Sequence, residues 1–402
     1  MERVVNRPQR SKEKLFIRQS SRTDIPMLIV TLLLVVIGLI MMYSASYIKA
    51  YSYGRSGWAY FTNQAIFAVI GIAAMLVISH INYRLIHTLS WPVWFFVLFS
   101  WLLLFLTLFS SANSKRWLGV GDMFSFQPSE LVKLAVIIFV SHIASLNPNR
   151  MKNFRYGFVQ PIVVLILFVV IMLLQPHYSG VIIITTLMIS MMFIGGARFR
   201  WFIFFAVIIA LFALLLFSTK AIPTYVLDRI AVFTNNTGSG TADSYQTEQS
   251  LIAIGSGGFN GLGLGNSRQK HHFLPEPQND FLFAIICEEL GFRGAVFVIA
   301  LFTYFVFRGI YISLHAKDKF GAMLATGITI EIALQVVLNI AVVTDTITNT
   351  GISLPFFSQG GTSLIVLLAE VGLLLSIARY TKTRDRLKDS STVFLDTEEE
   401  GL

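Results

Sequence analysis

The sequence has few charged residues. Only 13% of its 402 residues are Asp, Glu, Lys or Arg, whereas a typical soluble domain has about 25%. Hydrophobic residues make up 55% of the chain, and its mean hydropathy is +0.68. With so little charge, most helix surfaces have nothing polar to present to water and must face lipid. The composition excludes an ordinary soluble protein and predicts one helical bundle in a membrane.

Cysteine is almost absent, and the positive charge is not concentrated in a single patch. The only cysteine, Cys287, lies inside an apolar run, so no intramolecular disulfide can form. A net charge of +9 could indicate nucleic-acid binding. The basic residues, however, occur in short segments between long apolar runs, which is typical of topology signals in membrane proteins. We therefore expect no nucleic-acid partner.

About ten apolar runs approach the roughly 20 residues that a helix needs to cross a bilayer. The first run follows basic residues and has no evident cleavage site after it, so we interpret it as a retained span. The predicted spans are Met27–Tyr43, Gln64–Asn82, Ile86–Phe109, Ser129–Leu146, Phe158–Gln175, Gly180–Ile194, Phe199–Phe217, Phe281–Arg308, Gly321–Val343 and Thr362–Tyr380.

The distribution of charge predicts the orientation. Most of the 31 lysines and arginines lie in segments on the same side as the N-terminus. The positive-inside rule then places both termini of this all-α protein in the cytoplasm. The predicted parts are a basic tail at 1–25, a ten-helix domain at 26–382 with a large outward loop at 218–280, and a second tail at 383–402. Long loops without structure of their own tend to be functional, so we expect chemistry on the outer face.

Several ionisable residues lie inside predicted spans, where each costs about 2.5–3.5 kcal/mol on insertion scales. Glu130 and Lys133 are three residues apart at the outer end of the fourth span, close enough to pair. They either tether helices or form a polar wall of an outward cavity. Glu289 and Arg293 are four apart in the eighth span, and we expect them to form a structural pair.

Asp280 ends the long loop and begins the eighth span, after Pro275-Glu-Pro-Gln-Asn. A carboxylate there can cap the helix, or it can act as a general base held at the membrane surface. The glycine-rich run before it, 255–265, matches neither GxxxxGK(S/T) nor GxGxxG, so we expect no nucleotide site. His271 and His272 have no evident third ligand, so we expect no metal site there.

Three segments together resemble the shape, elongation, division and sporulation family. They are 115–133, which includes Lys115-Arg-Trp-Leu-Gly and Gln127-Pro-Ser-Glu, then 252–292, and finally 350–363. The form Pro-Glu-Pro-Gln-x-Asp is closer to the FtsW and SpoVE type than to the RodA type. The resemblance covers about 24–384 and implies a ten-helix fold with peptidoglycan glycosyltransferase activity on lipid II, for cell division or sporulation.

The resemblance also implies roles for individual residues. It implies Asp280 as the catalytic residue and Arg116, Glu130 and Lys133 as further functional residues, and we add Trp117, Gln127, Arg268 and Lys270 as substrate-binding candidates. A sugar hydroxyl needs a base as its bond forms, and a leaving diphosphate needs cations more than an acid. A divalent cation, Mg²⁺ or Mn²⁺, is a candidate cofactor. A class B penicillin-binding transpeptidase is the expected partner.

Three positions depart from the family pattern. Gln359 stands where a tyrosine is usual, Thr348 where a proline is usual, and Arg293 where most members have an apolar residue. None of them is Asp280, so the expected activity stands.

Two other functions stay open. A lipid II flippase needs ionisable residues through the full membrane thickness, as Glu331 and Glu370 could provide. A non-catalytic scaffold for a transpeptidase would keep its function after Asp280→Asn. An enzyme needs its polar cluster only near the outer surface.

Overall fold

The computed structural model describes residues 23–399, apart from 53, 55, 89, 111–115, 121–123, 147 and 208–241. Almost all regular structure is helical, with one two-stranded ribbon made of β1 (Leu118–Val120) and β2 (Phe124–Phe126). The α-helices are α1 (Ile25–Ser52), α2 (Ala59–His80), α3 (Arg84–Thr88), α4 (Ser90–Leu106), α5 (Pro128–Leu146), α6 (Pro148–Met151), α7 (Gln160–Leu174), α8 (Tyr178–Gly195), α11 (Ala242–Gly257), α12 (Leu282–Leu314), α13 (Lys319–Val343) and α14 (Gly361–Glu399).

Within the described ranges, nine helices are long and apolar enough to cross a membrane. They match nine of the predicted spans, including the closely spaced fifth and sixth, which became α7 and α8. Of the remaining predicted span, Phe199–Phe217, residues 199–207 are helical and the rest lies outside the described residues. The prediction of a polytopic helical membrane protein is confirmed.

Exposed apolar side chains show which helix faces meet lipid. On α1 the exposed residues recur every three or four positions, at Ile25, Ile29, Leu33, Val36 and Ile40. That spacing follows one face of a helix. The opposite face of α1 is buried in the protein. A helix that exposes one apolar face and buries the other packs against the bundle on one side and against acyl chains on the other.

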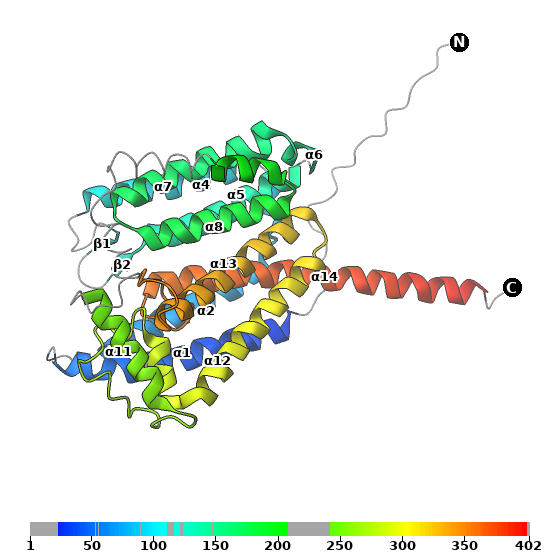
Figure 1. Cartoon of the computed structure of the whole chain (residues 1–402). Helices are drawn as coiled ribbons and strands as arrows, with labels where there is room; N and C mark the ends of the chain where they lie inside the picture. Colours follow the sequence, from blue (N-terminus) through cyan, green and yellow to red (C-terminus); the bar gives the residue numbers. More distant parts are fainter. Residues whose placement is uncertain are drawn as a thin grey trace, which may run out of the picture.

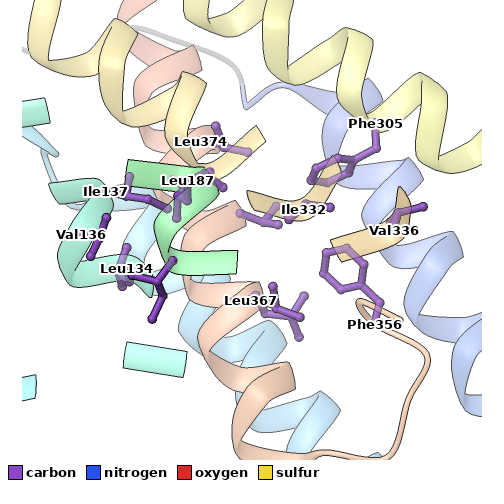
Figure 2. Packing of buried hydrophobic residues seen from close by; sticks show 14 of the residues in the cluster. Leu134, Val136, Ile137, Leu187, Phe305, Ile332, Val336, Phe356, Leu367 and Leu374 are labelled. Atoms are coloured by element: carbon purple, nitrogen blue, oxygen red, sulfur yellow. The ribbon is translucent and has the colours of Figure 1, made fainter. Parts of the chain in front are cut away.

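The interior is formed around α5, α13 and α14. Figure 2 shows Ile137 of α5, Leu187 of α8, Ile332 of α13 and Leu367 of α14 among the buried side chains that pack there. Each of the four is less than one-tenth exposed. Close packing of large apolar side chains lets the same interior hold a few charged groups in fixed positions.

The two ends of the bundle differ. In Figure 1, α1 begins and α14 leaves the bundle at one end, here called the termini end. The ribbon β1–β2 and helix α11 lie at the opposite end, here called the loop end. The segment that connects α13 to α14, residues 344–360, joins them there, because α13 ends and α14 begins at that end. Both described ends of the chain therefore lie on one side of the membrane domain.

Two local expectations were wrong. The long loop at 218–280 is not without structure, because α11 occupies 242–257 of it. The predicted pair Glu289–Arg293 does not form, because Gly291 has φ 68° and ψ −168° and breaks α12 between the two residues. Glu289 instead pairs with Lys270 at 2.9 Å, and Arg293 donates a hydrogen bond to Asn260 at 2.7 Å.

Candidate functional site

The ribbon β1–β2 brings together residues that are ten positions apart. Its antiparallel register pairs Leu118 with Phe126. Trp117 and Gln127, the next residues outward, therefore flank the base of the hairpin, and Arg116 precedes them. The Arg116 guanidinium donates hydrogen bonds to the carbonyl oxygens of Gln175, at 3.4 Å, and of Pro176. These bonds tie the hairpin to the turn between α7 and α8.

The first turns of α5 contribute a buried ion cluster. Lys133 Nζ lies 2.9 Å from Glu130 Oε2, which confirms the predicted pair, and 3.0 Å from Glu331 Oε1 on α13. Gln335 Nε2 donates to the same Glu331 oxygen at 2.9 Å. Lys133 therefore has two carboxylate partners within the protein. Its charge holds α5 and α13 together and is not a free cation for a substrate.

Asp280 lies immediately before α12, whose N-cap is Phe281. Asn339 of α13 fixes its backbone, because the Asn339 side chain donates to the carbonyl oxygens of Asp280 and Ile352, each at 2.7 Å. The side chain of Asp280 is different: within the described residues, no group donates a hydrogen bond to its carboxylate, and α12 has no side-chain cap. Asp280 therefore does not cap α12.

The surroundings of Asp280 bring the pKa of its carboxyl group close to neutral pH, as suits a general base. Burial raises the pKa of Asp280 to about 6, the nearby Arg116 lowers that pKa, and Glu276 raises it. A general base is most effective when its pKa lies near the working pH. A carboxylate that is shielded from water and has no internal donor is also available to accept a proton from a ligand.

One cavity at the loop end collects most of the predicted site residues. It has a volume of about 260 Å³ and opens among α5, α8, α13, α14, residues 279–280 and the segment 351–360. Six of the eight sequence-predicted residues line it: Arg116, Trp117, Gln127, Glu130, Lys133 and Asp280. Gln359, one of the departures from the family pattern, lines it as well, and its backbone N–H donates to the Gln278 carbonyl at 2.9 Å.

The other two predicted residues lie elsewhere. Lys270 is only 7% exposed, and its ammonium group contacts Glu289, Ser44 and the Gly265 carbonyl rather than the cavity. Arg268 is exposed on the same loop, where its backbone N–H donates to Glu288 at 2.8 Å. Neither residue lines the cavity. The buried carboxylates of α12 hold the loop in place, so the positive charge of Lys270 is neutralised inside the protein.

Several cavity residues did not stand out in the sequence. His177, Ser179 and Gly180 come from the start of α8, and Gln335 comes from the middle of α13. In the sequence, the run Gln175-Pro-His-Tyr-Ser-Gly180 indicates only a short turn between the fifth and sixth predicted spans. A polar histidine in a tight turn at the outer end of two apolar helices was the signal that could have identified it.

Within the described residues, protein side chains alone do not form a metal site in the cavity. Among the residues that the structure describes, no three His, Cys, Asp or Glu side chains form a cluster that could hold an ion. Glu130 is already paired with Lys133. Asp280 alone offers a free carboxylate, which fits Mg²⁺ or Mn²⁺ only where substrate phosphates supply further ligands.

Comparison with known proteins establishes the family. Residues 25–383 match the sequence model of the FtsW/RodA/SpoVE proteins, described as cell cycle proteins. This chain belongs to that family. It is 40% identical to the stage V sporulation protein E of Bacillus subtilis over 367 residues, covering 89% of this chain and 98% of that protein. It is 34% identical to a probable peptidoglycan glycosyltransferase FtsW of Geobacter metallireducens, covering 92% and 98%.

Solved structures share the fold of this FtsW/RodA/SpoVE member. A chain of a peptidoglycan synthase complex that coordinates polymerization and crosslinking aligns with a TM-score of 0.71 at 22% identity, covering 89% of this chain and 98% of that one. The Thermus thermophilus rod shape determining protein RodA aligns with a TM-score of 0.63 at 23% identity, covering 89% and 97%. The family and the helical architecture expected from the sequence are both confirmed.

Proposed function

We propose that this protein is a peptidoglycan glycosyltransferase that polymerises lipid II at the outer face of the cytoplasmic membrane. One observation carries the proposal: Asp280, with a free and partly buried carboxylate, shares a cavity with Arg116, whose charge is not paired with a carboxylate among the described residues. Relatives named as probable peptidoglycan glycosyltransferases support it, since their similarity extends over nearly the whole chain.

The reaction joins two lipid-linked disaccharides. The Asp280 carboxylate accepts the proton of the N-acetylglucosamine 4-hydroxyl as that oxygen attacks the anomeric carbon of the muramyl sugar of the other molecule. The new carbon–oxygen bond replaces the bond to phosphate, and undecaprenyl diphosphate departs with the bonding electron pair. Arg116 stabilises the charge that develops on the leaving diphosphate. Glu130 and Lys133 keep the α5 wall of the cavity in position.

The location of the cavity supports an outward-facing site. It lies at the loop end, opposite the described ends of the chain, which the positive-inside rule assigns to the cytoplasm. Lipid-linked substrates place their sugars at the headgroup level, where a cavity between helix ends can receive them. A class B penicillin-binding transpeptidase is the partner we propose, because a protein of the same fold belongs to a peptidoglycan synthase complex that coordinates polymerization and crosslinking.

The polymerisation of purified lipid II tests this function. Wild type, Asp280→Asn and the matched control Asp345→Asn would be assayed in detergent, with and without the cognate transpeptidase, and the glycan product separated on a gel. Asp345 is exposed at the loop end, does not line the cavity, and has a φ of 55° that asparagine also adopts. Polymer from wild type and Asp345→Asn but none from Asp280→Asn is the expected result.

The alternatives predict different results in this assay. A scaffold or a flippase gives no polymer under any condition, even with the partner present. Polymer from Asp280→Asn at the wild-type rate would remove Asp280 as the base and make Glu130 the next candidate.

A further inference from the structure

Helix α8 begins inside the cavity without a cap. It is 18 residues long, its N-cap is His177, and no side chain accepts a hydrogen bond at this end. Ser179 and Gly180 of its first turn line the cavity. The first N–H groups of a helix have no partner inside the helix, and they give this end a partial positive charge. Such an end accommodates anions when other groups complete a site.

His177 supplies the second, independent feature. Its side chain lines the cavity, the residue is only 7% exposed, and neither ring nitrogen makes a hydrogen bond within the described residues. The Nδ1 atom is completely enclosed. Burial, together with the charges of Arg116 and Lys133, lowers the pKa of His177 to about 4. The ring is therefore a neutral imidazole, which has one N–H to donate.

An enclosed polar group without a partner is costly, so His177 is expected to find its partner in a ligand. The ring packs against Gly180, where a Cβ atom would lie 2.9 Å from Nδ1. Neither ring nitrogen has a hydrogen-bond partner among the described residues, so the single N–H of the neutral ring is available to a ligand. The glycine thus allows the imidazole to lie directly over the first turn of α8.

Arg116 is held at the same place. Its guanidinium donates to the carbonyl oxygens of Gln175 and Pro176, the two residues that precede His177. Carbonyl partners fix the side chain but leave its charge unneutralised. Lys133, the other cation of the cavity, is already bound by two carboxylates. The positive character of the cavity is therefore concentrated around the start of α8.

We propose that the first turn of α8, His177 and Arg116 form a subsite for the diphosphate of a lipid-linked substrate. This inference rests on the proposed function, which supplies the substrate class. The helix N–H groups and the imidazole N–H donate to the phosphate oxygens, and Arg116 neutralises their charge. Asp280 belongs to the segment that precedes α12, so the base and the departing diphosphate are held by separate parts of the cavity wall.

Binding of farnesyl diphosphate to the full-length protein in detergent tests the subsite without requiring polymerisation. Isothermal titration calorimetry would compare wild type with His177→Leu, His177→Asn and Gly180→Ala. The control His271→Leu changes an exposed histidine outside the cavity. We expect His177→Leu to weaken binding by about tenfold or more, because a hydrogen bond to a charged group is lost. His177→Asn keeps a donor and should stay within about threefold of wild type.

Gly180→Ala provides a variant that displaces the imidazole without removing it. The new Cβ would lie 2.8 Å from His177 Cε1, so the ring must shift. The subsite is supported if Gly180→Ala and His177→Leu bind farnesyl diphosphate more weakly than wild type. Their thermal midpoints should equal that of wild type, and His271→Leu should bind with the wild-type affinity. Equal binding by His177→Leu and wild type overturns it, whether or not lipid II is polymerised.

The source of the phosphate is tested in the same titration. Inorganic pyrophosphate should compete with farnesyl diphosphate, whereas farnesol should not. Phosphatidylglycerol added at the same concentration should compete poorly. If phosphatidylglycerol competes as well as pyrophosphate, the subsite is a general headgroup site and the proposal fails. If pyrophosphate competes but Asp280→Asn still polymerises lipid II, the subsite stands and only the role of Asp280 is lost.

Discussion

At the scale of single residues, Asp280 is set apart from the other carboxylates of the loop end by what surrounds it. Glu276, four residues earlier, accepts hydrogen bonds from Gln278 at 3.0 Å and Asn279 at 3.1 Å and pairs with Lys49. Asp280 has no such donor within the described residues. The pair Lys49–Glu276 therefore lies beside the proposed base, and the negative charge of Glu276 raises the pKa of Asp280.

The pH dependence of polymerisation should follow from this arrangement. A general base works as the carboxylate, so the rate should fall as pH drops through about 6, the raised pKa of Asp280. Glu276→Gln removes a negative charge, which lowers the pKa of Asp280. The acid limb of the pH–rate profile should then move to lower pH while the rate at pH 8 changes little. Glutamine keeps an oxygen that can accept from Gln278 and Asn279.

Lys49→Met gives the opposite shift and serves as the control. It leaves Glu276 without its cation, which raises the pKa of Asp280 and moves the acid limb to higher pH. Limbs that move in the same direction in both variants would show that Glu276 acts through loop structure and not through charge.

Sequence spacing predicted some residue contacts but not others. Glu130 and Lys133 are one helical turn apart, so their pairing could be read from the fourth span alone. Glu331 joins the same lysine from a helix almost two hundred positions later, which no local pattern shows. His177 was overlooked because its role depends on the cavity that Asp280 and Arg116 complete from distant segments of the chain.

At the scale of elements, the break in α12 explains how the loop before Asp280 is held. Because α12 is interrupted at Gly291, the carbonyl groups of Glu288 and Glu289 have no helical partner. The backbone N–H groups of Leu262 and Gly263 donate to them at 3.0 and 2.9 Å. Gly261 allows this approach, since it has φ +79° and a Cβ there would lie 2.2 Å from the Glu289 oxygen.

The side chains of the same two glutamates complete the anchor. Glu288 accepts from the Ser267 hydroxyl at 2.5 Å, and Glu289, which is fully buried, accepts from Ser44 of α1 at 2.7 Å and from Lys270 at 2.9 Å. These contacts connect α1, the loop and α12. The sequence showed the charges but not the break, because one glycine does not alter the apolar periodicity of the span.

Removing one member of the buried pair should destabilise the protein strongly. Glu289→Leu leaves the Lys270 ammonium buried without a carboxylate, and breaking such a pair typically costs about 3–5 kcal/mol. The thermal midpoint in detergent should fall accordingly. The double variant Glu289→Leu/Lys270→Met removes both charges and should recover much of the loss. A double variant no more stable than Glu289→Leu would mean that the hydrogen bonds to Ser44 and Ser267, and not the ion pair, hold the loop.

At the scale of the whole molecule, the membrane-spanning helices could largely be predicted from the sequence. The packing of these helices against one another could not. Nine of the expected spans are present in the described residues because length and hydropathy suffice to define them. Helix α11 was missed because its mostly polar sequence gives no membrane signal. The arrangement of the helices around α5, α13 and α14 depends on side chains that meet across the bundle, and no single span specifies it.

Two ion pairs connect helices at the termini end of the bundle. Asp24 pairs with Arg308 at 2.7 Å, and Arg84 pairs with Asp318 at 2.8 Å. Both pairs lie where spans enter or leave the end that carries most of the basic residues. From the positive-inside rule we predict that this end faces the cytoplasm and that the cavity faces outward.

Cysteine labelling in intact cells would test that orientation. Cys287 is the only cysteine in the sequence, so Cys287→Ala gives a background without cysteine. Because Cys287 is buried, alanine at this position adds no polar group to the interior. In this background, Thr346→Cys places a thiol at an exposed position of the loop end, and Lys317→Cys places one at an exposed position of the termini end. A membrane-impermeant maleimide should label Thr346→Cys in intact cells and label Lys317→Cys only after lysis. The reverse pattern would put the cavity in the cytoplasm, where lipid II carries its sugars only before translocation, and an outward-facing polymerase would then be excluded.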